Sequence, residues 1–246
     1  ICWSLVGSEM CIRDRAARDE GVGLYNMEAK TFKNLGGSIR FNSGVTELLT
    51  SDRSVSGVIV GGEKYKADAV ILACGGFEAN NKLREEEFGL DWNKAKVRGT
   101  PHNTGDGLTM AFALGAQRYG KFDGCHATPM DLHMKDFGNL GIPPNQRKNY
   151  RKICYFLGVM LNAYGSRFVD EGKNFRNYTY AQFGRAVLEQ PEHFAWQIFD
   201  SKVFDLLYEE YRTEDASFVE AGSLEELVAK LLSLIHISEP TRLQQI

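Results

Sequence analysis

The sequence predicts an α/β fold built in two parts. Residues 69–73 read Ala-Val-Ile-Leu-Ala, and such a continuous apolar run is typical of a strand buried on both faces of a parallel sheet. Segments with the apolar spacing of helices alternate with strand-like segments on both sides of this run. From about Phe122 the sequence turns irregular and aromatic, with scattered Gly and Pro residues. This change predicts a domain boundary that separates residues 16–121 from residues 122–231.

Apolar spacing and glycine stops predict the elements in order. A helix at 16–36 is closed by Gly36-Gly37, and a hairpin is expected where two strands flank the Gly61-Gly62 turn. The predicted strands are 38–42, 45–49, 55–60, 63–67, 69–73, 156–162 and 166–169. The other predicted helices begin near Asn81 and span 108–114, 178–189, 201–211 and 223–231.

Composition excludes several classes of protein. Of the 246 residues, 25% are charged and 43% are hydrophobic, which is ordinary for a soluble globular protein. The formal net charge of −3 argues against nucleic acid as the main partner, because phosphate binding favours a basic surface. No apolar run approaches the roughly 18 residues that predict a membrane span.

The two ends of the chain are expected to be non-native. Residues 5–14 read LVGSEMCIRD and residues 232–242 read LSLIHISEPTR. Both can be encoded by DNA strings that are reverse complements over nearly their whole length, and these strings resemble a transposase-end sequencing adapter. Residues 1–15 and 232–246 are therefore not expected to belong to the native fold. The rest keeps Cys74, Cys125 and Cys154, which form neither a disulfide framework nor a zinc site and suit a reducing, cytoplasmic compartment.

Two glycine-bearing segments are candidates for cofactor binding. The apolar run ends in Ala73-Cys74-Gly75-Gly76, where small residues let a backbone approach a cofactor, although a Gly pair after a strand is often only a tight turn. The segment Thr104-Gly105-Asp106-Gly107 opens a helix whose first N–H groups favour an anion. A plain cap by the Thr104 or Asp106 side chain is the alternative.

Three charged or titratable side chains are candidates for the substrate site. His126 lies in DGCHATP, but a lone histidine is more often structural. Arg176 lies in a stretch that also contains Asp170 and Glu171, so a buried ion pair is its alternative role. His102, before the second glycine segment, is a weaker candidate on the substrate side.

The order of these motifs resembles that of the fumarate reductase and succinate dehydrogenase flavoproteins. Those proteins carry an ATGG turn, then TGDG, a His-Pro-Thr segment and a G-x-RFVNE stretch that leads to an arginine; here the matching stretches are ACGG, TGDG, HAT and GSRFVDE. KVRGTPHNTGDGL, GCHATP, FRNYTYAQFGR and AWQIFD look like the tricarballylate dehydrogenases within that family. Two departures are Ala127 in place of proline and one extra residue before Arg176.

The resemblance implies FAD as cofactor and two partial domains. Residues 16–121 would be part of a Rossmann-like FAD-binding domain without its N-terminal GxGxxG segment, and residues 122–231 most of a capping domain. Arg176 and His126 would be catalytic, with Thr128 and His102 binding substrate and no metal. The implied cofactor contacts are Val45, Ala73, Cys74, Gly75, Gly76, Thr104, Gly105, Asp106 and Gly107.

The implied activity is oxidation of tricarballylate to cis-aconitate by hydride transfer to flavin N5. The implied partners are a polycarboxylate substrate and an electron acceptor, with no membrane span. Three alternatives stay open: a reductase of enoates such as fumarate or urocanate, a 3-ketosteroid dehydrogenase, and a non-catalytic α/β interaction module. The printed chain alone is expected to be inactive.

Overall fold

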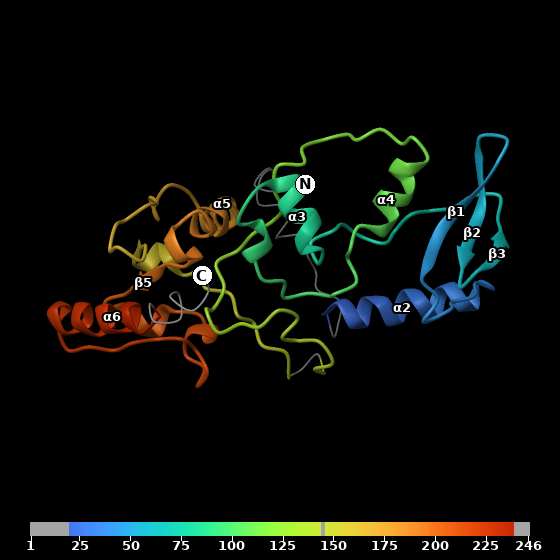
Figure 1. Cartoon of the computed structure of the whole chain (residues 1–246). Helices are drawn as coiled ribbons and strands as arrows, with labels where there is room; N and C mark the ends of the chain where they lie inside the picture. Colours follow the sequence, from blue (N-terminus) through green and yellow to red (C-terminus); the bar gives the residue numbers. More distant parts are fainter. Residues whose placement is uncertain (1–19, 144–145, 239–246) are drawn as a thin grey trace. The chain divides into compact units, whose positions relative to one another are not determined.

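A computed structural model describes residues 20–143 and 146–238 of the chain. The chain divides into two compact units. Figure 1 draws the helices and strands of both. Of the described residues, unit 1 comprises 20–93, 97–125, 136–143 and 146–147, and unit 2 comprises 94–96, 126–135 and 148–238. Of the two end segments expected to be non-native, 1–15 and 239–246 lie outside the described residues, whereas 232–238 form the end of the helix α6 (Leu224–Ser238).

The described part of unit 1 combines a small sheet with three α-helices. A glycine ends each of these helices: Gly36 follows α2 with φ 89°, Gly89 caps α3 with φ 97°, and Gly115 follows α4 with φ 90°. Their positive φ angles suit residues without a β-carbon. The elements are α2 (Glu20–Asn34), β1 (Val45–Ser51), β2 (Ser54–Val60), β3 (Glu63–Lys66), α3 (Asn81–Phe88) and α4 (Asp106–Ala113), with the 3-10 turn η2 (Trp92–Lys94) running from unit 1 into unit 2.

The sheet of unit 1 is an antiparallel meander in the order β1-β2-β3. The predicted hairpin is confirmed: Val60 pairs with Glu63 across the Gly61-Gly62 turn, whose φ angles of 57° and 85° suit a tight hairpin. Gly57 faces β3 so closely that a β-carbon there would lie 2.0 Å from the carbonyl oxygen of Tyr65.

Two predicted strands of unit 1 are wrong. Residues 38–42 form no strand, because the backbone bends there and Asn42 adopts φ 53°. Residues 69–73 run as irregular chain, and Ile71 is 88% exposed. A strand needs hydrogen-bonded neighbours, and within 20–143 and 146–238 no strand pairs with this run.

An aromatic cluster packs α3 against the chain that follows it. Phe88 lies between Phe77 and Trp92, with ring centroids 5.0 and 5.3 Å away. Arg84 is buried beside them; its Nη1 donates to the Glu78 carbonyl over 2.7 Å, and its Nη2 donates to Asn81 Oδ1 over 2.6 Å. Burial lowers the pKa of Arg84, although nearby acidic groups oppose that shift.

Unit 2 has an apolar core to which α5 contributes Phe183. Four buried side chains form this core: Ile153, Tyr155, Met160 and Phe183. The elements are η4 (Tyr155–Leu157), β4 (Val159–Leu161), α5 (Arg176–Leu188), η5 (Pro191–His193), β5 (Trp196–Ile198), η6 (Ser201–Leu206), η7 (Glu209–Tyr211) and α6 (Leu224–Ser238).

Unit 2 corrects three further predictions. The strand expected at 156–162 shortens to β4, which pairs antiparallel with β5. The strand expected at 166–169 is a single bridge, Leu161 to Arg167, because the Asn162 side chain accepts hydrogen bonds from Tyr164 and Ser166 and turns the chain. The helix expected at 201–211 consists of η6 and η7. The α/β class itself is confirmed by the mixture of helices and strands.

A search of the described helices finds none long and apolar enough to cross a membrane.

Candidate functional site

The turn after the apolar run is small and open. Cys74 and Gly75 are exposed, and Gly75 has φ 77°. A β-carbon on Gly75 would lie 2.8 Å from Asn103 Oδ1, so a larger residue would collide with that amide. Asn103 is held in turn by donating to Glu78 Oε1. The backbone of this turn is therefore accessible to a bound molecule.

The start of α4 has no side-chain cap among the described residues. Gly105 is the N-cap residue, with φ 88°, and neither Thr104 nor Asp106 caps the first turn. A β-carbon on Gly105 would lie 2.8 Å from Phe77 Cβ, so this close packing requires glycine. The first N–H groups of α4 can therefore meet an oxygen or an anion.

The structure brings the two glycine segments together in unit 1. A β-carbon on Gly107 would lie 2.2 Å from the Sγ atom of Cys74. Asn80 Nδ2 donates to the Thr104 carbonyl over 3.0 Å, which ties the second segment to the chain after the first. We call residues 73–76 and 104–107 together the glycine cluster. Val45 belongs to a different element, at the start of β1 opposite Val60.

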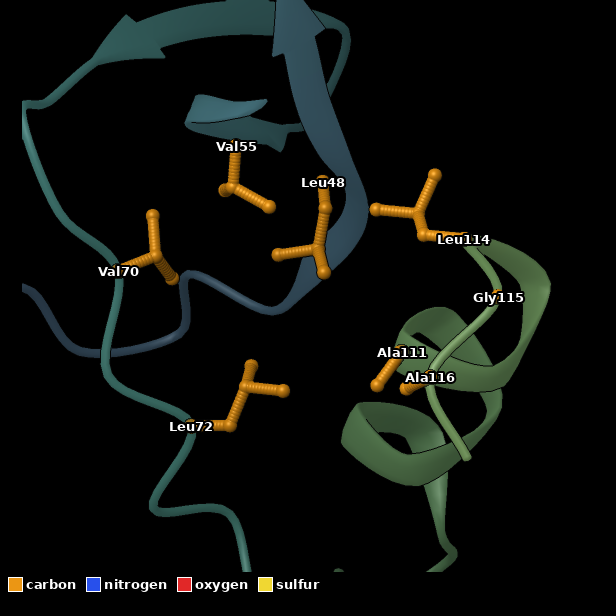
Figure 2. Close-up of a pocket in the computed structure, with 8 residues that line it drawn as sticks. All are labelled: Leu48, Val55, Val70, Leu72, Ala111, Leu114, Gly115 and Ala116. Carbon is orange, nitrogen blue, oxygen red and sulfur yellow. The ribbon is translucent and has the colours of Figure 1, made fainter. Parts of the chain in front are cut away.

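An apolar cleft of about 340 Å³ lies in unit 1, where β1 and β2, the 69–73 run and α4 meet (Figure 2). Its lining offers no charged or hydrogen-bonding side chain, so it does not suit a polycarboxylate. The lining residues are Leu48, Val55, Val70, Leu72, Ala111, Leu114, Gly115 and Ala116.

Arg176 is the first residue of α5 in unit 2. Its guanidinium carbon lies 5.6 Å from the centroid of the Tyr208 ring, within range of a cation–π interaction. Glu171, a possible ion-pair partner, instead binds Arg167 and the Met160 N–H. Asp170 accepts from the Gly172 N–H. The half-buried Arg176 therefore begins α5, and the two acidic residues before it, Asp170 and Glu171, bind other groups.

His126 and Thr128 lie along the same helix. The exposed imidazole of His126 meets the ring of Tyr180 edge to face, with centroids 4.9 Å apart. A β-carbon on Gly184 would lie 2.5 Å from the Thr128 nitrogen. The structure thus places Arg176, His126 and Thr128 in unit 2, while His102, exposed beside Thr104, belongs to unit 1.

Sequence reasoning missed three residues that shape these sites: Asn103, Tyr180 and Gly184. The spacing of Tyr180 and Gly184, four and eight residues after Arg176, was a usable signal, because residues four apart share one helix face. Asn103 gave no comparable signal, since its contact with Gly75 depends on the path of the chain.

Comparison with known proteins assigns the chain to a family. The family described as FAD binding domain matches residues 11–229. The chain belongs to this family, whose cofactor is FAD. It is similar to a probable fumarate reductase of Shewanella frigidimarina, with 28% identity over 208 residues that cover 78% of this chain and 31% of the relative.

Two solved structures are also similar. An open flavocytochrome c3 fumarate reductase matches with a TM-score of 0.58 and 25% identity over 88% of this chain and 37% of the other. A 3-ketosteroid Δ1-dehydrogenase of Sterolibacterium denitrificans matches with a TM-score of 0.50 and 25% identity over 70% of this chain and 31% of the other. The chain thus spans about a third of the length of these relatives.

Proposed function

We propose that the whole protein is an FAD-dependent dehydrogenase that oxidises a carbon–carbon bond of a polycarboxylate, with tricarballylate as substrate and cis-aconitate as product. The observation that carries this proposal is the assembly of Arg176, His126 and Thr128 along one helix of unit 2. A cation, an imidazole and a hydroxyl suit carboxylate binding. FAD, the cofactor of the family, would supply the redox chemistry.

The glycine cluster of unit 1 fits the cofactor. Gly75 and Gly105 adopt positive φ angles at positions where a β-carbon would collide, and the first turn of α4 has no side-chain cap among the described residues. These features suit close approach of a cofactor to backbone N–H groups. We propose that residues 73–76 and 104–107 hold FAD together with Val45. When bound, FAD supplies two-electron chemistry by accepting hydride at its N5 atom.

The residues of unit 2 would act on the substrate carboxylates. The planar guanidinium of Arg176 can bind one carboxylate through two parallel hydrogen bonds, while His126 and the Thr128 hydroxyl address another oxygen. Each such charge-assisted bond is worth about 1.5–3 kcal/mol. When these side chains bind the carboxylate next to the reacting carbon, they stabilise the carbanion-like charge that develops as the proton leaves. We propose that this proton departs through Arg176. Because arginine stays protonated, its guanidinium can take up the proton only as it passes one of its own protons to a relay group beyond it.

The two units then have distinct roles. Residues 16–121, most of which lie in unit 1, are proposed to be part of the FAD domain. Residues 122–231, most of which lie in unit 2, are proposed to form most of the capping domain that excludes water from the substrate. His102 is proposed as a substrate-side residue contributed by unit 1. The further partner is an electron acceptor, and a cytoplasmic location is proposed from the three cysteines. The names of the relatives argue against a non-catalytic module.

A second candidate function comes from the same relatives: reduction of an enoate, or desaturation of a 3-ketosteroid. Reduction of fumarate would use the same carboxylate-binding side chains. A steroid would instead need an apolar surface. The cleft of unit 1 is apolar, but its lining shares no residue with the proposed substrate site, where the half-buried Arg176 lies. A polycarboxylate therefore remains the better match.

The test is a substrate panel on the full-length protein with FAD. Tricarballylate oxidation is followed with an artificial electron acceptor, beside fumarate and urocanate reduction and oxidation of a 3-ketosteroid. We expect turnover with tricarballylate and none with the steroid. Turnover of the steroid alone would replace the proposed function by the second candidate, and a protein that binds no flavin would contradict both.

A further inference from the structure

One face of α5 carries three residues at helical spacing: Arg176, Tyr180 and Gly184. Residues four apart in a helix lie one above the other, about 6 Å apart along the axis. The three residues therefore form a single row along the helix, which we call the α5 row.

The segment 126–128 runs against this row. The Tyr180 ring holds the His126 imidazole at 4.9 Å with an interplanar angle of 69°. One turn further on, a β-carbon on Gly184 would lie 2.4 Å from the carbonyl carbon of Ala127. The missing side chain at Gly184 thus allows the segment to approach the helix closely. The Tyr180 ring contacts the His126 imidazole on the same face of the helix.

Tyr180 lies at the margin of the core. It packs against the buried cluster that includes Phe183, yet it is only half-buried itself, and it also contacts the exposed imidazole of His126. Its hydroxyl group is not needed for an edge-to-face ring contact, since the attraction comes from the aromatic ring. A phenylalanine would therefore preserve the contact, whereas an aliphatic residue would remove it.

We propose that Tyr180 is a positioning residue that holds the imidazole of His126 against α5 at a position one helical turn along from Arg176, so that both groups address the carboxylates of one substrate. This inference rests on the proposed function. The spacing between the two groups would then select substrates whose carboxylates have a matching separation. Tyr180 itself acts through His126 rather than on the substrate.

The test compares Tyr180→Phe, Tyr180→Leu and the control Tyr178→Leu in the full-length holoenzyme. Tyr178 lies on the same helix, is 51% exposed, and serves as a tyrosine outside the α5 row. We expect Tyr180→Leu to raise the KM for tricarballylate about 2- to 10-fold, the range for losing an aromatic pair, with a smaller change in kcat. Tyr180→Phe and Tyr178→Leu should match the wild type in KM, and all variants should keep FAD.

A double-mutant cycle distinguishes positioning from general destabilisation. If Tyr180 acts through His126, Tyr180→Leu should cost little in a His126→Ala background, because the group that it positions is already gone. Independent effects of the two substitutions would overturn the inference. So would an equal loss in Tyr180→Phe and Tyr180→Leu.

A second measurement does not depend on turnover. The proton resonances of the His126 ring should move in Tyr180→Leu and stay nearly unchanged in Tyr180→Phe, because the neighbouring aromatic ring is kept only in the latter. If the wild type oxidises no polycarboxylate, the proposed function fails, and this resonance still reports on the contact. A His126 resonance unchanged in Tyr180→Leu would overturn the positioning role whatever the substrate.

Discussion

The Sγ atom of Cys74 occupies the space that a side chain on Gly107 would need, 2.2 Å from the position of its β-carbon. This contact joins the turn after the apolar run to the first turn of α4. The two segments lie far apart in sequence, yet each limits the side chain that the other can carry. The glycine cluster is therefore one structural unit, and its parts should respond together to substitution.

Substituting Gly107 should weaken cofactor binding. Gly107→Ala forces the Cys74 side chain to move, and overpacking of this kind typically costs about 1–3 kcal/mol. If the FAD-binding conformation bears this cost, FAD binding weakens about 5- to 150-fold. Flavin absorbance per protein measures the occupancy. The double variant Cys74→Ala/Gly107→Ala should recover it, because the colliding sulfur is gone. Gly21→Ala on α2, where nothing lies within 4 Å, is the control.

Unit 2 should lose stability in acid through Glu171. Burial would raise the pKa of Glu171, but hydrogen bonds from Arg167 and the Met160 N–H outweigh burial and hold the pKa below its usual value. A depressed pKa in the folded state contributes stability above the unfolded pKa of about 4.3, and that contribution is lost as the pH falls through the folded value. Glu171→Gln should therefore flatten the dependence of unfolding free energy on pH below about 4.3.

The matched control for Glu171 is Glu189. Both carboxylates pair with an arginine four residues away, but the side chain of Glu189 is 61% exposed and that of Glu171 only 3%. Glu171→Gln should cost about 1–3 kcal/mol at neutral pH, because the buried Met160 N–H loses a charged acceptor. Glu189→Gln should cost less than about 0.5 kcal/mol. Equal unfolding free energies for the two variants would contradict this assignment.

Arg84 should be essential for the stability of unit 1. Arg84→Ala leaves the Glu78 carbonyl and the Asn81 side chain without their buried donor and opens a cavity, at a cost of about 3 kcal/mol. Lys82→Ala on the same helix should be nearly neutral, since the Lys82 side chain is 86% exposed. Chemical denaturation of the two variants measures the difference, and comparable losses would show that burial of Arg84 is not the cause.

Local features of the fold could be predicted from the sequence. The Gly61-Gly62 hairpin and the helices that begin at Asn81 and Asp106 depend on turn and cap residues that act on their neighbours. Pairing could not be predicted in the same way. Residues 69–73 have the composition of a buried strand, but a strand also needs partners, and apolar content does not specify them.

For the candidate site, too, local features could be predicted from the sequence and long-range contacts could not. The motif order identified Arg176, His126 and both halves of the glycine cluster as candidates, because small residues and charges leave local signals. The contacts that organise them, Cys74 with Gly107 and His126 with Tyr180, join segments distant in sequence. Such contacts depend on the tertiary path of the chain, which a local sequence pattern does not specify.

The most direct test of the proposed function is turnover per bound flavin in Arg176→Lys. Lysine keeps the positive charge but loses the planar fork that binds a carboxylate through two bonds. We predict that turnover per flavin falls about 100-fold or more, as when a transition-state donor is removed, while FAD content stays at the wild-type level because Arg176 lies in unit 2. Near-normal turnover per flavin would contradict the account and remove Arg176 from the mechanism.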